Sequence, residues 1–230
     1  MSLTGLLPLR RHQIAWLSDA GWRGVLNGDW ATEARACLAH WAAHRLPLVV
    51  TRQAGSIEAG SIALGLPAPG CFGRQRLAAT VARGAVLYFD EFPLAERALG
   101  LLPGAARPPW RDLCAALKAT GAVSRVYGSY GWQLMSGLDH VHAGSDIDLW
   151  LSVSDADQAD AVAACLQRFA VQAPRLDGEL MFDDGAAVAW REWRVWRAGA
   201  TTALLVKGID GPSLQRLPGW PGRQAVRAAA

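Results

Sequence analysis

The chain has 230 residues, of which 51% are hydrophobic and 19% charged, so it has ample material for a folded core. This length suits two small domains better than one. The net charge of +3 is mild, and no dense basic stripe is present, which argues against a nucleic-acid partner. No stretch approaches the roughly 18 to 20 apolar residues that span a bilayer.

The cellular location is predicted from the same features. Near the N-terminus the apolar run precedes the arginines, which is the reverse of a secretory signal. We therefore expect a soluble, cytoplasmic protein without a membrane partner. The four cysteines are far apart and form no CxxC pair, so they are interpreted as free thiols rather than zinc ligands.

The first half of the chain predicts a small α+β domain. The elements expected there are a helix over residues 29–44 and strands over residues 47–52, 61–66 and 73–77. Residues 103–109 contain three prolines, which cannot continue a helix or a central strand. We therefore predict two domains, an N-terminal substrate- or carrier-binding domain over residues 1–108 and a catalytic domain over residues 109–230.

The second half predicts a mixed central sheet flanked by helices, which makes the fold class α+β. The expected helices cover residues 109–120, 128–138, 154–169 and 191–197. The expected strands cover residues 124–127, 145–153, 176–182, 186–190 and 203–207. Residues 145–153 alternate, so that Ile147 and Leu149 face one way while Asp146 and Asp148 face the other.

Asp146 and Asp148 are the strongest candidates for chemistry. Two carboxylates on one face of a strand, roughly 6.5 to 7 Å apart, repel each other unless a cation lies between them. A divalent metal turns this repulsion into attraction and can clamp a phosphate group for in-line displacement. Mg²⁺ suits such oxygen ligands, and Mn²⁺ is the other ion expected.

Two further features belong with this pair. Gly128 and Ser129 stand between a strand and a helix, where free N–H groups suit a phosphate. Asp177 and Glu179 lie two residues apart on a later strand and can supply a third carboxylate. Asp177 is the first choice, because a glycine follows it and gives it room, and Glu179 is the alternative.

Each feature alone has an ordinary explanation. A lone DxD pattern is usually a solvated strand end, and a lone Gly-Ser before a helix is usually a cap. Their combination in this order, with the apolar face of the DxD strand anchored in a core, favours an active site.

The run Gly128-Ser129-Tyr130-Gly131-Trp132-Gln133, followed by Ser145-Asp146-Ile147-Asp148-Leu149, resembles the signature of the polymerase-beta-like nucleotidyltransferase superfamily. The fuller run GSYGWQLMSGLDHVHAGSDIDLWL is similar to the malonate decarboxylase holo-acyl-carrier-protein synthase family, as is the later DGEL…AVAWREW…LLVK. The Arg52 strand, the GLPAP segment and Arg74-Gln75-Arg76 extend this resemblance to nearly the whole chain. Ser136 stands where threonine is expected in many members, which keeps the hydroxyl.

The resemblance implies a reaction and its partners. Such enzymes move the phosphoribosyl-dephospho-CoA part of 2′-(5″-triphosphoribosyl)-3′-dephospho-CoA to a serine of the apo acyl carrier protein of malonate decarboxylase, and pyrophosphate leaves. Asp146, Asp148 and Asp177 would hold the metal. The residues implied to contact substrate are Gly128, Ser129, Gln133, Arg52, Arg74, Arg76 and Lys207.

Three alternatives remain open at this point. The same fold could act on another hydroxyl acceptor, either a small molecule or a protein. A nucleotidyltransferase-like binding module without activity is disfavoured by the two intact aspartates. For the three arginines and Lys207, a solvated surface position is about as compatible with the sequence as a substrate contact. The eleven tryptophans are compatible with a homodimer.

Overall fold

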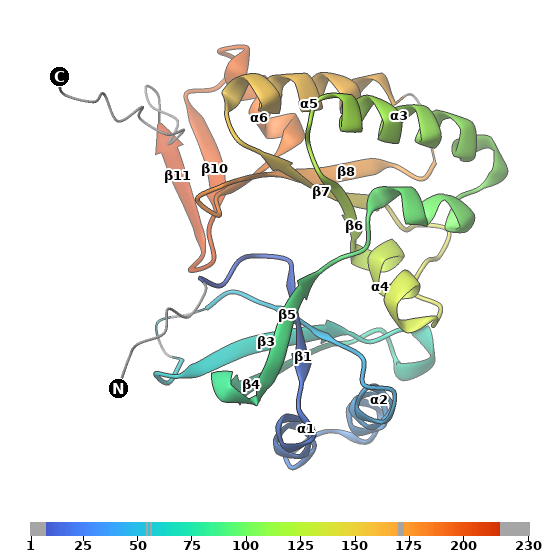
Figure 1. Ribbon diagram of the computed structural model, residues 1–230, viewed down its shortest axis with the longest axis vertical. Helices are drawn as coiled ribbons and strands as arrows, with labels where there is room; N and C mark the ends of the chain where they lie inside the picture. The colour runs from blue at the N-terminus through green and yellow to red at the C-terminus, as the bar shows by residue number, and fades with distance from the viewer. Residues whose placement is uncertain (1–7, 54, 56, 170–172, 217–230) are drawn as a thin grey trace. The chain divides into compact units, whose positions relative to one another are not determined.

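The computed structural model describes residues 8–53, 55, 57–169 and 173–216 (Figure 1). The extreme N-terminus, on which the prediction about a secretory signal partly rests, lies outside these residues. The chain forms two compact units: unit 1 is Met1–Phe92 with Ile209–Gly211, and unit 2 is Pro93–Gly208 with Pro212–Ala230.

Unit 1 is built on a five-stranded antiparallel sheet in the order β4-β3-β2-β1-β5. Its strands are β1 (Gln13–Leu17), β2 (Leu48–Val50), β3 (Ser61–Pro67), β4 (Arg76–Ala82) and β5 (Val86–Glu91). Helices α1 (Asp19–Leu26) and α2 (Thr32–Ala43) pack against each other, and α1 also contacts β4. Short 3-10 turns, η1 (Gly70–Phe72) and η2 (Arg83–Ala85), connect the strands.

Unit 2 contains a six-stranded mixed sheet in the order β11-β10-β9-β8-β7-β6. Its strands are β6 (Ser124–Tyr127), β7 (Ile147–Val153), β8 (Leu176–Phe182), β9 (Ala187–Ala189), β10 (Ala203–Lys207) and β11 (Pro212–Arg216). Only the β7–β8 pair is parallel among these described strands. Parallel neighbours need a crossover connection, and helix α5 (Ala156–Arg168) supplies it.

The helices of unit 2 divide between two places. Helices α3 (Arg107–Ala119), α5 and α6 (Trp190–Arg197) lie in a row along the sheet, and Figure 1 shows them as one layer. Helix α4 (Gly128–Ser136) instead contacts β6 and β7. The turns η3 (Ala95–Leu101) and η4 (Gly104–Ala106) precede α3. The layer covers the apolar face of the sheet, so polar side chains of β7 must project from the other face.

The core of unit 2 explains why β7 forms where it does. Burial along the strand alternates strictly, and Ile147, Leu149, Leu151 and Val153 are almost completely buried. The predicted alternation is therefore confirmed, and it fixes the register of the strand, because a slip by one residue would expose this apolar set.

The structure confirms the α+β fold class. Along the chain, the division between the two units follows Phe92, whereas the sequence predicted a domain boundary after residue 108. Of the prolines that suggested the later boundary, Pro103 directly precedes η4, and Pro108 and Pro109 lie in the first turn of α3, where a backbone N–H would have no partner within the helix. Strands β1, β5 and β11 and helix α1 were not predicted.

No helix in the described ranges combines the length and the apolarity that crossing a bilayer demands.

Trp193 gives a direct test of this packing. Its ring is fully buried against Phe182 and Trp196, and its indole N–H donates a 2.8 Å hydrogen bond to Asp160. The substitution Trp193→Phe should lower the free energy of unfolding by about 1–3 kcal/mol, because it leaves a cavity and removes that hydrogen bond. Urea denaturation measures this. Val195→Ala, at an exposed position of the same helix, is the control and should change stability by less than about 0.5 kcal/mol.

Candidate functional site

The parallel pairing of β7 with β8 places two carboxylates opposite each other. In this register Asp148 lies beside Asp177, whereas Glu179 lies beside Trp150, two residues further along. Neighbouring strands are roughly 4.8 Å apart, so Asp148 and Asp177 can serve one ligand. Asp146 lies just before the first residue of β7, at the same end of the pair. The strand pair therefore gathers three of the predicted carboxylates.

Gly178 allows the two strands to lie this close. A Cβ atom at this position would stand 2.6 Å from the carbonyl oxygen of Leu149 and 3.2 Å from its Cβ. Real Cβ atoms essentially never come within 3.0 Å of a backbone oxygen, so any larger residue would push β8 away from β7. The glycine that follows Asp177 thus sets the spacing of the carboxylates on the two strands.

Gly128 allows the start of α4 to lie close to Asp148. Tyr127 pairs with Asp148 across β6 and β7, and Gly128 then turns the chain with a φ of 59°. A Cβ at Gly128 would lie 3.0 Å from Cγ of Asp148 and closer still to its Oδ2. The side chain of Tyr127 does not cap the helix. The first turn of α4, with Ser129 half-buried in it, therefore lies directly beside the carboxylate, as the phosphate-cradle hypothesis requires.

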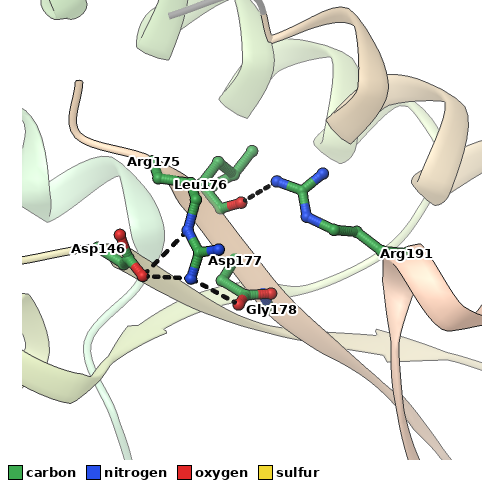
Figure 2. Close-up of polar contacts among 6 residues, drawn as sticks. All are labelled: Asp146, Arg175, Leu176, Asp177, Gly178 and Arg191. Carbon is green, nitrogen blue, oxygen red and sulfur yellow. Dashed lines mark hydrogen bonds and ion pairs between the residues drawn. The ribbon is translucent and has the colours of Figure 1, made fainter. Parts of the chain in front are cut away.

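Arg175 belongs to the candidate site, and the sequence reasoning missed it. Its Nε and Nη2 donate to Oδ2 of Asp146 at 3.1 and 2.6 Å, and Nη2 also lies 3.6 Å from Oδ2 of Asp177 (Figure 2). A signal was present, because Arg175 stands two residues before Asp177 and residues so spaced share a strand face. Among the described residues no three Asp, Glu, His or Cys side chains are gathered at metal-binding spacing. In this arrangement, Arg175 supplies the positive charge between Asp146 and Asp177.

The electrostatics single out Asp148. Burial, followed by the nearby charges of Asp177, Asp146 and Glu179, raises the pKa of its carboxyl group to about 7, while Arg175 opposes the rise. Such crowding of like charges is unfavourable in a stable fold without a compensating cation. A perturbed pKa of this kind is typical of functional sites, where groups are held close for chemistry rather than for stability.

Glu179 and Lys207 form an ion pair with each other. Nζ of Lys207, the last residue of β10, donates a 2.7 Å hydrogen bond to Oε1 of Glu179, whose side chain is only 7% exposed. The pair compensates the buried charge of Glu179. This geometry favours Asp177 over Glu179 as the third carboxylate, although both assignments stay predictions, as does a role for Lys207 at the substrate.

Gln133 and Ser145 shape the loop before β7. Oε1 of Gln133 accepts hydrogen bonds from the backbone N–H groups of His140 and Val141, at 3.1 and 2.8 Å. The hydroxyl of Ser145 accepts from the N–H of His142 at 3.0 Å. Gln133 therefore connects α4 to the loop that precedes Asp146, and its contact with substrate stays a prediction.

Arg52, Arg74 and Arg76 belong to unit 1 and are all exposed. Arg76 begins β4, but Arg74 has a left-handed φ of 51°, so the segment is not extended through it. Arg74 and Arg76 therefore do not share the face of one extended strand. Their binding of substrate phosphates stays a prediction.

Comparisons with known proteins match both halves of the chain. Residues 10–92 match the model of the phosphoribosyl-dephospho-CoA transferase MdcG N-terminal domain, and residues 93–218 match that of its C-terminal domain. The two matches meet where the structure divides into units. No solved structure gives a significant match.

Curated relatives extend over nearly the same length. A phosphoribosyl-dephospho-CoA transferase of Xanthomonas axonopodis pv. citri is 37% identical, covering 94% of this chain and 99% of the relative. Another, from Bradyrhizobium diazoefficiens, is 36% identical and covers 88% of each chain. A third, from Pseudomonas putida, is 33% identical over 89% of this chain and 92% of its own. The chain therefore belongs to the phosphoribosyl-dephospho-CoA transferase family and is a transferase.

Proposed function

We propose that this transferase moves the phosphoribosyl-dephospho-CoA group of 2′-(5″-triphosphoribosyl)-3′-dephospho-CoA to a serine of the apo acyl carrier protein subunit of malonate decarboxylase, with release of pyrophosphate. Family membership supports the transferred group. The observation that carries the chemistry is the meeting of Asp148, Asp177 and Asp146 with the first turn of α4 at one end of the β7–β8 pair.

The three carboxylates are proposed to hold Mg²⁺ or Mn²⁺. The donor set fits a hard divalent cation, because it consists of oxygens with excess negative charge. Burial and the neighbouring carboxylates disfavour the charged form of Asp148, and a cation held there would favour it. Bound there, the metal supplies positive charge that neutralises phosphate oxygens.

The chain's own groups then divide the remaining work. The N–H groups at the start of α4, with the hydroxyl of Ser129, bind the leaving pyrophosphate. The oxygen of the carrier serine forms a bond to the α-phosphorus, and the bond from that phosphorus to pyrophosphate breaks. Asp177, whose side chain is 37% exposed, is proposed to accept the serine proton. Arg52, Arg74 and Arg76 are proposed to bind substrate phosphates.

Two further proposals concern the whole protein: that it is cytoplasmic and that it forms a homodimer.

Intact-mass analysis of the carrier tests the reaction. The apo carrier protein, incubated with this protein, Mg²⁺ and triphosphoribosyl-dephospho-CoA, should gain the mass of one phosphoribosyl-dephospho-CoA group. A carrier whose acceptor serine is replaced by alanine should gain nothing. An unchanged mass for the intact carrier would exclude the proposed acceptor and favour another hydroxyl compound.

Substitution of the carboxylates tests the site. Asp148→Asn and Asp177→Asn should each lower the transfer rate by at least about 100-fold, because a lost ligand weakens metal binding and misplaces the phosphate. Asp183→Asn, in the exposed turn after β8, is the matched control and should keep the wild-type rate. Glu179→Gln should keep Mn²⁺ affinity while lowering the melting temperature. Loss of Mn²⁺ binding in Glu179→Gln but not in Asp177→Asn would reverse the assignment.

Gly128→Ala tests the contact between α4 and Asp148. The added methyl group collides with the carboxylate, so we expect about a 100-fold fall in transfer rate, the usual cost of misplacing a reacting group by about 1 Å. Gly137→Ala is the control, because Gly137 has a similar positive φ at the other end of α4 but open space around it. Equal losses in the two variants would mean that backbone strain alone explains the effect.

The raised pKa of Asp148 predicts a pH-dependent stability of the metal-free protein. Since the folded state holds this proton more tightly than the unfolded chain, stability falls as pH rises from the ordinary carboxyl range through about 7. Asp148→Asn avoids this loss, so its melting temperature should exceed that of the wild type more at about pH 8.5 than at about pH 5. Differential scanning fluorimetry in chelator measures both, and Mn²⁺ should remove the advantage. A constant difference across this range would contradict the assigned pKa.

A further inference from the structure

We propose that Arg175 is a displaceable counter-ion of the active site: it competes with the divalent cation for Asp146 and Asp177 and, once displaced, binds the phosphates of the substrate. This inference rests on the proposed function, because it requires a metal at the same carboxylates.

The position of the guanidinium supports the competition. A single nitrogen, Nη2, lies 2.6 Å from Asp146 and 3.6 Å from Asp177, so one positive charge bridges carboxylates at the starts of two adjacent strands. Figure 2 shows the guanidinium between the two side chains. Asp146 and Asp177 are also carboxylates that would hold the divalent cation, which carries twice the charge of the guanidinium. The guanidinium would therefore compete with the metal for these two side chains.

The backbone of Arg175 is fixed, whereas its side chain can move. The carbonyl oxygen accepts a 2.8 Å hydrogen bond from the N–H of Ile147, which ties the residue to the start of β7. The side chain is 61% exposed. Exposed ion pairs of this kind contribute little to stability, so a cation can displace the guanidinium at small cost.

A displaced Arg175 remains beside the metal site, because its backbone does not leave the strand end. The planar guanidinium presents paired N–H donors that match phosphate oxygens. Arg191, the other arginine drawn in Figure 2, is not available in the same way: its Nη2 donates to the carbonyl of Leu176 at 2.7 Å, and its guanidinium stacks on Trp190. Arg175 is thus the arginine of this strand end that can pass from carboxylate to phosphate.

The test measures two affinities that must move in opposite directions. In Arg175→Ala, the dissociation constant for Mn²⁺ alone, measured from the electron paramagnetic resonance signal of free Mn²⁺, should fall by about threefold or more, because the competing charge is gone. With saturating Mn²⁺, the dissociation constant for inorganic pyrophosphate, measured by calorimetry, should rise by about threefold or more. A general loosening of the site would weaken both.

Two variants control for charge and for folding. Arg111→Ala removes an exposed arginine from α3 and should leave both constants unchanged. Arg175→Lys keeps the charge, so its Mn²⁺ affinity should stay near that of the wild type while pyrophosphate binding weakens.

Unchanged constants in Arg175→Ala, or two shifts in the same direction, would overturn the inference and leave the proposed function intact. Equal Mn²⁺ binding by the wild type and Asp148→Asn would instead overturn the metal site itself, and the inference with it.

Discussion

The parallel pairing of β7 with β8 is the constraint on which the site depends. It is the only parallel pair among the described strands of unit 2, and its register sets Asp148 beside Asp177. The apolar residues of β7 hold the strand in the core, and Gly178 lets β8 approach it. Helix α5 connects the two strands and covers the buried face, which leaves the opposite face to the carboxylates. The burial of the apolar side chains beneath the carboxylates therefore offsets the electrostatic repulsion among them.

The grouping of the carboxylates also explains why positively charged side chains lie beside them. Glu179, further along β8, is neutralised by Lys207, while Asp146 and Asp177 share Arg175. Asp148 lies near all three of these carboxylates, and its pKa is raised by burial and by their charges. The uncompensated negative charge is therefore concentrated around Asp148, where a divalent cation would stabilise the site most.

Much of unit 2 could be predicted from sequence because its signals are local. The period-two pattern of β7 and the Gly128-Ser129 step at the start of α4 required no knowledge of distant residues. The choice between Asp177 and Glu179 did require such knowledge, because both lie on one face of β8. Only the pairing of β8 with β7 and the contact of Glu179 with Lys207 distinguish the two carboxylates. Arg175 was missed for a related reason: its hydrogen-bonded ion pair with Asp146 joins residues 29 positions apart. In unit 1, the strand over residues 47–52 was predicted and contains β2, whereas β1 and β5 were not predicted, and their pairing links distant segments.

The contact between Gly128 and Asp148 has a consequence for how such a chain can change over time. The two residues share one small volume, so a side chain at position 128 is compatible only with a shorter residue at position 148. While selection maintains the carboxylate, the glycine has no acceptable replacement by an L-amino acid. Once a residue shorter than aspartate stands at position 148, that steric restriction disappears, although the positive φ still disfavours larger residues at position 128. A relative that has abandoned catalysis should therefore lose the aspartate first and the glycine afterwards, and the order of these losses would record the history of the site.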